Sequence, residues 1–195
     1  MPETARTITE ADILPMAEYD SRRAELKKTI LPLKKTRRVE VGPFATFYFE
    51  NYATMWMQVQ EMLRIEKGGA EQVAGELAAY NPLIPQGDEL IATMMLEIAD
   101  GARRTSTLLT LGGIEESVFL EIGGETVQAT PTEYDDRTTA DGKTSSVHWL
   151  RFKLSKAQIA RFATDRVVIG IGHKNYGHMA VLSDVTRAAL AKDFA

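Results

Sequence analysis

The chain has 195 residues, of which 44% are hydrophobic and 26% charged, and its formal net charge is −4 at pH 7. The absence of cysteine excludes disulfides, zinc–thiolate sites, a cysteine nucleophile and cysteine-ligated iron–sulfur clusters. The N-terminus has no apolar segment of signal-peptide length, and no apolar run approaches the roughly 18 residues of a membrane span. The sequence therefore predicts a cytoplasmic protein without a membrane span.

The first predicted helix begins after a capping-box pattern at Thr9 and Asp12 and runs to about Ile30, where Pro32 ends or bends it. A basic run overlaps its end, since residues 21–38 contain eight basic residues and one acid. Such a run is either a solvated helix face or a docking patch for an acidic partner. It contains no aromatic residue, which argues against nucleic acid as the partner. The basic residues are Arg22, Arg23, Lys27, Lys28, Lys34, Lys35, Arg37 and Arg38.

The next segments predict a β-hairpin followed directly by a helix. "RRVEV" and "FATFYFE" are strand-like and are joined by a Gly-Pro turn. Residues 49–66, "FENYATMWMQVQEMLRIE", carry an apolar stripe at helical spacing, which predicts a helix that faces the core. The opposite side carries a methionine among polar residues, and we interpret it as a solvent-exposed face or as a surface that contacts a partner or substrate. That candidate surface consists of Met57, Gln60, Glu61 and Arg64.

The remainder of the chain predicts mainly strands. "LIATMMLEIA" is apolar on both faces, which is typical of a central strand covered on both sides. "SVFLEIGGETVQA" predicts a hairpin with a Gly-Gly turn, "SVHWLRFKLS" a strand, and "RVVIGIGH" with "HMAVL" a final hairpin. The polar residues 131–145 predict a mobile loop. The pattern indicates one α+β domain over residues 1–195, with a mainly antiparallel sheet packed with helices.

Three histidines and one glutamate form a candidate metal site. Four residues separate His173 from His178, and a four-residue hairpin loop would place the two imidazoles directly opposite each other. His148 alternates with apolar residues and is expected to point inward, and Glu97 ends one face of the central strand. Iron or zinc could be held by such a set. The alternative is that the histidines are structural or pH-sensitive and that Glu97 pairs with an arginine.

Glu50 stands at the end of a predicted strand, directly before a helix that Asn51 can cap. We interpret Glu50 as a solvated residue or as one that interacts with the dipole of the helix N-terminus. No phosphate-binding loop, serine nucleophile elbow or HExxH motif occurs, so the sequence identifies no catalytic residue.

Four segments carry a family resemblance: "FENYATMWMQVQEMLRIE", "AYNPLIPQGDEL", "SSVHWLRF" and "HKNYGH". Together they resemble an uncharacterised bacterial family, domain-of-unknown-function family 3501, and the resemblance covers nearly the whole chain. Family members tend to be encoded beside rubrerythrin and a heterodisulfide-reductase-like iron–sulfur protein. The resemblance therefore implies a link to redox chemistry or peroxide defence, with rubrerythrin or an iron–sulfur oxidoreductase as partner. It implies no catalytic residue.

Three functions are compatible with these observations. The first is an accessory or interaction protein of a bacterial redox or peroxide-defence system, without catalytic activity of its own. The second is a metal-dependent enzyme that uses His173, His178 and a carboxylate, with iron or zinc as the cofactor. The third is a small-ligand binding module with a deep pocket and no metal.

Overall fold

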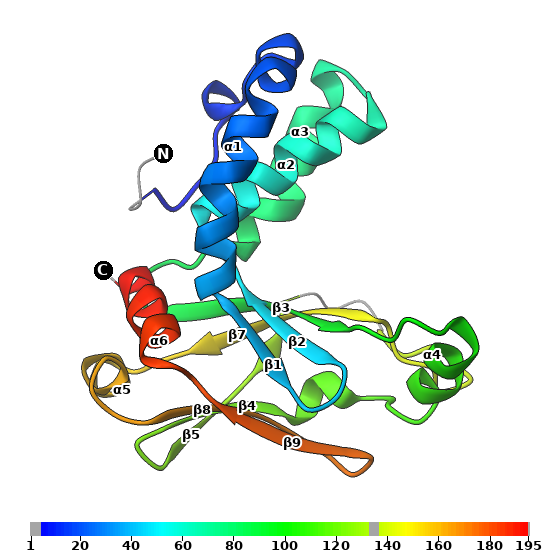
Figure 1. Cartoon of the computed structure of the whole chain (residues 1–195), viewed down its shortest axis with the longest axis vertical. Helices are drawn as coiled ribbons and strands as arrows, with labels where there is room; N and C mark the ends of the chain where they lie inside the picture. Colours follow the sequence, from blue (N-terminus) through cyan, green and yellow to red (C-terminus); the bar gives the residue numbers. More distant parts are fainter. Residues whose placement is uncertain (1–4, 133–136, 195) are drawn as a thin grey trace.

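The computed structural model describes residues 5–132 and 137–194, which form a two-sheet sandwich and a helical projection that rises from it (Figure 1). Sheet A has the strand order β1-β2-β3-β7-β6, and sheet B has the order β5-β4-β8-β9. All neighbouring strands are antiparallel. The predicted α+β class is confirmed, but the strands form two sheets rather than one.

The strands of sheet A are β1 (Arg38–Val41), β2 (Ala45–Phe49), β3 (Glu89–Leu96), β6 (Thr130–Pro131) and β7 (Val147–Lys153). Those of sheet B are β4 (Val118–Ile122), β5 (Glu125–Gln128), β8 (Val167–His173) and β9 (Tyr176–Val181). The helical projection consists of α1 (Met16–Thr36), α2 (Tyr52–Glu66) and α3 (Ala70–Tyr80). The remaining helices are α4 (Gly101–Leu108), α5 (Lys156–Phe162) and α6 (Asp184–Leu190), and the short 3-10 helices are η1 (Glu10–Asp12), η2 (Asn81–Leu83), η3 (Ile114–Ser117) and η4 (Ala191–Asp193).

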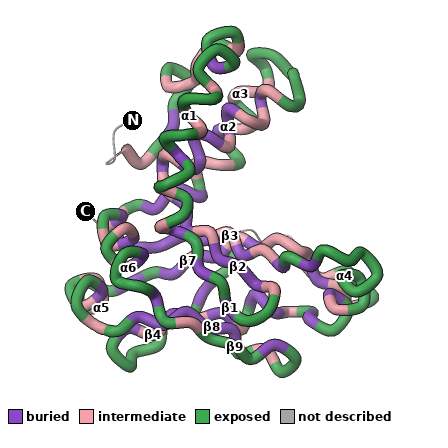
Figure 2. The backbone as a smooth tube through the Cα atoms, viewed as in Figure 1, coloured by how far each residue is buried: buried purple, intermediate pink, exposed green. Residues whose placement is uncertain are grey.

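The two sheets bury their facing sides against each other. On β3, Leu90 and Met94 are fully buried and share an apolar cluster with Leu120 and Ile169 of sheet B. Ile91 points to the opposite side, as strand alternation requires, and belongs to a second cluster under the helices. The prediction that this strand is central and covered on both sides is thus confirmed for most of its length, since only Thr93 and Met95 on the outer face are partly rather than fully buried (Figure 2).

The second apolar cluster lies inside the helical projection. The stripe of α2 that includes Trp56 and Val59 packs with Tyr19 and Ile30 of α1 and with Leu77 of α3. The prediction that this stripe is core is confirmed. No helix in the described part of the chain is both long and apolar enough to cross a membrane.

The first helix differs from its prediction at both ends. The capping box of Thr9 and Asp12 closes the single turn of η1, and α1 begins later, at Met16. The prediction that the helix runs only to about Ile30 is wrong, because α1 continues to Thr36, so Pro32 does not end it. A proline inside a helix removes one backbone hydrogen bond. The residue after the helix, Arg37, is buried and donates to the Glu50 carbonyl oxygen, which anchors the C-terminal end of α1.

The predicted hairpins form, but the last one has another register. His173 lies opposite Tyr176 and His178 lies opposite Ile171, so only two residues form the loop. The prediction that His173 and His178 face each other is therefore wrong. The buried Tyr176 hydroxyl donates to the Val41 carbonyl oxygen at 2.7 Å, which holds this residue in the strand.

Part of the predicted mobile loop, residues 133–136, lies outside the described residues. The described part contains the last residue of β6, Pro131, and a β-bridge between Thr138 and Thr144. Mobility over residues 131–145 stays a prediction.

Candidate functional site

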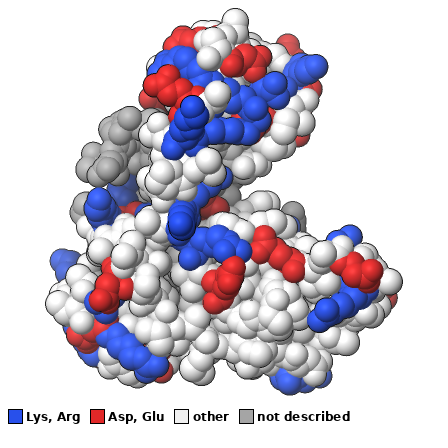
Figure 3. All heavy atoms as spheres, in the orientation of Figure 1, with Lys and Arg blue, Asp and Glu red and all other residues white. Residues whose placement is uncertain are grey.

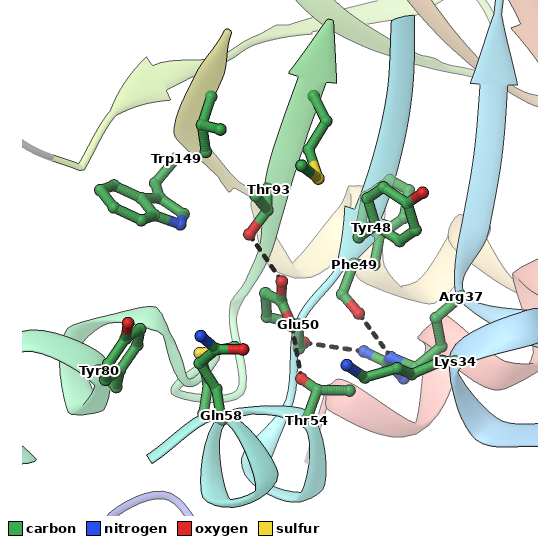
Figure 4. Close-up of a pocket in the computed structure, with 13 residues that line it drawn as sticks. Lys34, Arg37, Tyr48, Phe49, Glu50, Thr54, Gln58, Tyr80, Thr93 and Trp149 are labelled. Atoms are coloured by element: carbon green, nitrogen blue, oxygen red, sulfur yellow. Dashed lines mark hydrogen bonds between the residues drawn. The ribbon is translucent and has the colours of Figure 1, made fainter. Parts of the chain in front are cut away.

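A pocket of about 320 Å³ lies where the helical projection meets the outer face of sheet A (Figure 4). Its walls come from α1, β2, α2, α3, β3 and β7, so residues far apart in the sequence converge on it. Tyr48, Tyr80 and Trp149 supply aromatic walls, while Met55 and Met95 supply thioethers. The space is therefore mainly apolar, with a few polar groups at defined places.

Glu50 is fixed within this pocket by the junction between β2 and α2. Its N–H donates to the carbonyl oxygen of Ile91 at 2.8 Å, which continues the pairing of β2 with β3. The next residue, Asn51, caps α2, because its side chain accepts from the N–H of Thr54 at 3.0 Å. The predicted cap is confirmed. The interpretation of Glu50 as a solvated residue is wrong, since only 8% of it is exposed.

The Glu50 carboxylate accepts one hydrogen bond on each oxygen. The hydroxyls of Thr93 and Thr54 both donate to it at 2.6 Å. Burial raises the pKa of Glu50, and the two hydroxyls and the charges of Lys34 and Arg37 oppose this shift. Among the described residues Glu50 forms no ion pair. A buried carboxyl group that forms no ion pair with a described residue thus lies in the pocket, with Lys34 and Arg37 as its cationic neighbours.

Arg37 lies beside Glu50 but is committed elsewhere. Its guanidinium donates to the carbonyl oxygens of Phe49 and Glu50, both at 2.9 Å, and forms a buried ion pair with Asp193. Burial raises the pKa of Asp193, and the Arg37 charge opposes this shift. Arg37 therefore ties the end of α1 to β2 and to the C-terminal segment. The prediction that Arg37 belongs to a docking patch is wrong, because its side chain is buried.

The other polar side chains surround Glu50 from several elements. Figure 4 shows Trp149 and Tyr80 on one side of Glu50, Tyr48 and Lys34 on the other, and Gln58 reaching up from α2. The arrangement can hold a small molecule between aromatic walls and present a carboxyl group to it.

The predicted metal residues do not come together. His173 accepts a hydrogen bond at Nδ1 from the N–H of Asn175 at 3.3 Å, within the hairpin loop. His178 packs edge-on against the ring of Tyr176 at a centroid distance of 4.6 Å. Neither histidine therefore has the other as its neighbour, because the two-residue loop displaces them along the strands.

His148 and Glu97 lie on opposite faces of sheet A. His148 points inward, as predicted, and its Nδ1 lies 3.7 Å from the Glu115 carboxylate, while burial lowers its pKa. Glu97 lies on the outer face and accepts from the hydroxyls of Thr46 at 2.6 Å and Tyr48 at 2.9 Å. In residues 5–132 and 137–194, no group of three or more His, Asp or Glu side chains could hold a metal ion.

The predicted partner surface on α2 is covered by α1. Met57 and Gln60 are buried, and Tyr19 of α1 donates to the Met57 sulfur at 3.2 Å. Glu61 pairs with Arg23 and Lys27 of α1. The interpretation of this side as exposed is therefore wrong for Met57 and Gln60. A four-residue spacing on α1, of Tyr19, Arg23 and Lys27, was the signal that this helix packs on α2.

Arg64 of the same candidate surface pairs with Asp20 of α1 at 2.7 Å and remains partly exposed. Figure 3 shows Lys and Arg side chains interspersed with Asp and Glu side chains over the helical projection. Five of the eight basic residues of the run form ion pairs, namely Arg22, Arg23, Lys27, Arg37 and Arg38. Most of the predicted patch is thus neutralised within the chain.

Sequence reasoning missed most of the pocket. Tyr48, Gln58, Tyr80, Thr93 and Trp149 come from five separate elements, and no local pattern links them. One signal was present: on the outward-facing side of the central strand, the polar Thr93 stands between the apolar Ile91 and Met95.

Comparisons with known proteins agree with this architecture. Residues 7–194 match the family described as "Protein of unknown function (DUF3501)". A crystal structure of a protein of unknown function from Burkholderia pseudomallei K96243 is 34% identical, with a TM-score of 0.88. The match covers 97% of this chain and 100% of that one, so it spans both the sandwich and the helical projection. None of the curated proteins matches the chain.

Proposed function

The chain belongs to the DUF3501 family, and we propose that it binds a small molecule in the pocket between the helical projection and sheet A. The observation that carries this proposal is the buried Glu50 carboxyl group, which has no ion-pair partner among the described residues and faces a space with aromatic walls. A pocket that is mostly apolar and has a few convergent polar groups is typical of ligand sites.

The energetics of burial support a functional role for Glu50. Burying an ionised carboxylate costs on the order of several kcal/mol of folding free energy, unless a cation or several hydrogen-bond donors compensate for the lost hydration. Stability alone would favour an apolar side chain at this position. Two threonine hydroxyls compensate only part of the cost, and the raised pKa of Glu50 reflects the remainder. Ionisable groups with such shifts in a pocket are candidates for contact with a ligand.

The rigid surroundings of the pocket also support the proposal. Arg37 fixes the end of α1 against β2, and the Asn51 cap fixes the start of α2. Glu50 lies between these two anchors. A site on rigid elements loses little conformational entropy when a ligand binds.

The test is nondenaturing mass spectrometry of protein purified from its native host, with a variant that fills the pocket. Gln58→Trp places a bulky ring into the space, and Ile65→Trp on the exposed side of α2 is the matched control. We expect a small molecule to dissociate from wild type and from Ile65→Trp but not from Gln58→Trp. Absence of any bound molecule in the wild type, or equal amounts in all three proteins, would contradict the proposal.

A second role concerns protein partners. We propose that the chain acts as an accessory protein of a bacterial redox or peroxide-defence system, with rubrerythrin or an iron–sulfur oxidoreductase as partner. This rests on the family resemblance, and the exposed Lys28 and Lys35 on α1, which form no ion pair among the described residues, favour an acidic partner. Reversal of both to Glu is expected to weaken co-purification of that partner, most strongly at low salt. Unchanged co-purification would contradict this role.

A further inference from the structure

The buried ionisable group of the pocket is acidic. Arg37 pairs with Asp193 and donates to backbone carbonyl oxygens, so its donors are already used, and its charge only moderates the raised pKa of Glu50. Lys34 is exposed and carries its charge on a flexible stem that can turn to solvent. Glu50, in contrast, is buried and held in place by two hydroxyls. An occupant of the pocket therefore meets a fixed carboxyl group.

The hydrogen-bond directions around Glu50 indicate what it lacks. The Thr54 oxygen accepts from the N–H of Asn51 at 2.9 Å, so the Thr54 proton is free to point at the Glu50 carboxylate. Thr93 donates to the other carboxylate oxygen. A carboxylate has about four acceptor positions, and these two hydroxyls use two of them. The remaining positions call for a hydrogen-bond donor, which a bound anion cannot supply.

The walls of the pocket suit a positive charge. Trp149, Tyr48 and Tyr80 carry the electron-rich faces that attract cations. Two of these rings already attract cations within the chain: Arg137 lies 4.7 Å from the centroid of Trp149, and Arg38 lies 5.7 Å from that of Tyr48. The volume of about 320 Å³ lies at the lower end of the range for ligand sites, so the ligand is compact.

From these observations we infer that the ligand is a small organic cation, a protonated amine carried on a compact apolar or aromatic group. The ammonium group pairs with Glu50 and donates to its unused acceptor positions. The apolar part lies among Trp149, Tyr80 and Met95. This inference rests on the proposed ligand-binding function and adds the chemical class of the ligand.

Isothermal titration calorimetry with three probes of one shape tests the inference. Benzylamine is cationic near pH 7, benzyl alcohol is neutral and benzoate is anionic, and all three carry the same ring. We expect benzylamine to bind wild type more tightly than benzyl alcohol, and benzoate to bind least. Glu50→Gln should weaken benzylamine by about tenfold to a hundredfold, the range for a lost charge-assisted hydrogen bond, and should leave benzyl alcohol nearly unchanged.

Two further variants complete the design. Glu121→Gln, on β4 in the other sheet, is the matched control and should bind benzylamine like the wild type. Trp149→Leu keeps the carboxyl group and removes one aromatic wall, so it should weaken benzylamine several-fold even if Glu50→Gln does not fold.

The outcomes separate this inference from the proposed function. Tighter binding of benzoate or benzyl alcohol than of benzylamine would overturn the cation while leaving a ligand pocket in place. Benzylamine binding that survives both Glu50→Gln and Trp149→Leu would place the amine elsewhere and would also overturn it. If no probe binds, the inference of a cationic ligand is overturned. The mass spectra of wild type and Gln58→Trp then show separately whether the pocket binds any small molecule.

Discussion

The two faces of sheet A are made by alternate residues of the same strands, yet they are buried in different ways. On β2, Phe47 and Phe49 face sheet B and belong to a continuous apolar cluster. Tyr48 and the following Glu50 face the helices and line the pocket. The inner face is closed by a second sheet along its length, whereas the helical projection covers the outer face only in part (Figure 1). Partial cover leaves room for polar groups, so one face provides stability and the other provides the candidate site.

The largest expected effect is a difference in the free energy of unfolding between alanine variants of two adjacent residues, one on each face of sheet A. Phe47→Ala should lower the free energy of unfolding by about 3–5 kcal/mol, because it removes a fully buried ring and leaves a cavity. Tyr48→Ala should cost about 1 kcal/mol, since Tyr48 is only partly buried and its hydroxyl bond to Glu97 is exposed. Urea unfolding of both variants measures the difference. Similar losses would mean that the two faces contribute equally to stability.

The next effect concerns the buried ion pair beside the pocket. Asp193→Ala leaves the Arg37 charge buried without its counter-ion, and we expect a loss of about 3 kcal/mol in the free energy of unfolding. Asp184→Ala is the matched control, because Asp184 also pairs with an arginine but its side chain is 92% exposed. Its loss should stay within about 0.5 kcal/mol. Equal losses would contradict the anchoring role of Arg37.

The third substitution, at Glu50, should raise the free energy of unfolding, whereas the first two lower it, because the buried Glu50 carboxylate is expected to destabilise the fold. Burial raises the pKa of Glu50 above its ordinary value of 4.5. The folded state therefore holds this proton at pH values where the unfolded state has released it, and stability falls as the pH rises through the folded pKa. Glu50→Gln removes this dependence and should be more stable than wild type at pH 8.

The measurement is thermal or urea unfolding of wild type and Glu50→Gln from pH 4 to pH 8. The advantage of the variant should shrink toward pH 4, where Glu50 is protonated in both states. A variant that is less stable than wild type at pH 8 would show that the carboxylate is compensated within the fold, contrary to its proposed role as a ligand contact.

Local features of this fold were predictable from the sequence, because they depend on neighbouring residues. The cap at Asn51, the apolar stripe of α2 and the Gly-Gly turn between β4 and β5 all follow from spacing or from the conformation that glycine allows. The covered central strand was also evident from its two apolar faces. Each of these needs only a short window of sequence.

The candidate site was not predictable in the same way. The burial of Glu50 depends on α1 and α3 approaching sheet A, and no local pattern encodes that approach. The register of His173 and His178 was predicted wrongly because a two-residue loop and a four-residue loop both fit the segment. The hydrogen bond from Tyr176 to Val41, which holds Tyr176 in the strand, joins residues far apart in the sequence and is not visible in a local pattern. The prediction that Met57 is exposed failed for a related reason, because its burial depends on where α1 packs on α2.

The smallest expected effect concerns Glu61 of α2, a glutamate in the helical projection that can be compared with Glu50. Like Glu50, Glu61 accepts from a hydroxyl, here that of Tyr19, but it also pairs with Arg23 at 2.7 Å. The bond to Arg23, helped by Tyr19 and Lys27, lowers the pKa of Glu61 to about 2. Stability from such a group is present above its ordinary pKa of 4.5 and is lost as the pH falls toward 2. Glu61→Gln should therefore be less stable than wild type at pH 7, by about 0.5–1 kcal/mol because solvent screens the partly exposed pair. The deficit should shrink below pH 4, which is the opposite slope to that of Glu50→Gln. Parallel slopes for the two variants would mean that the compensated and the uncompensated glutamate do not differ in the folded protein.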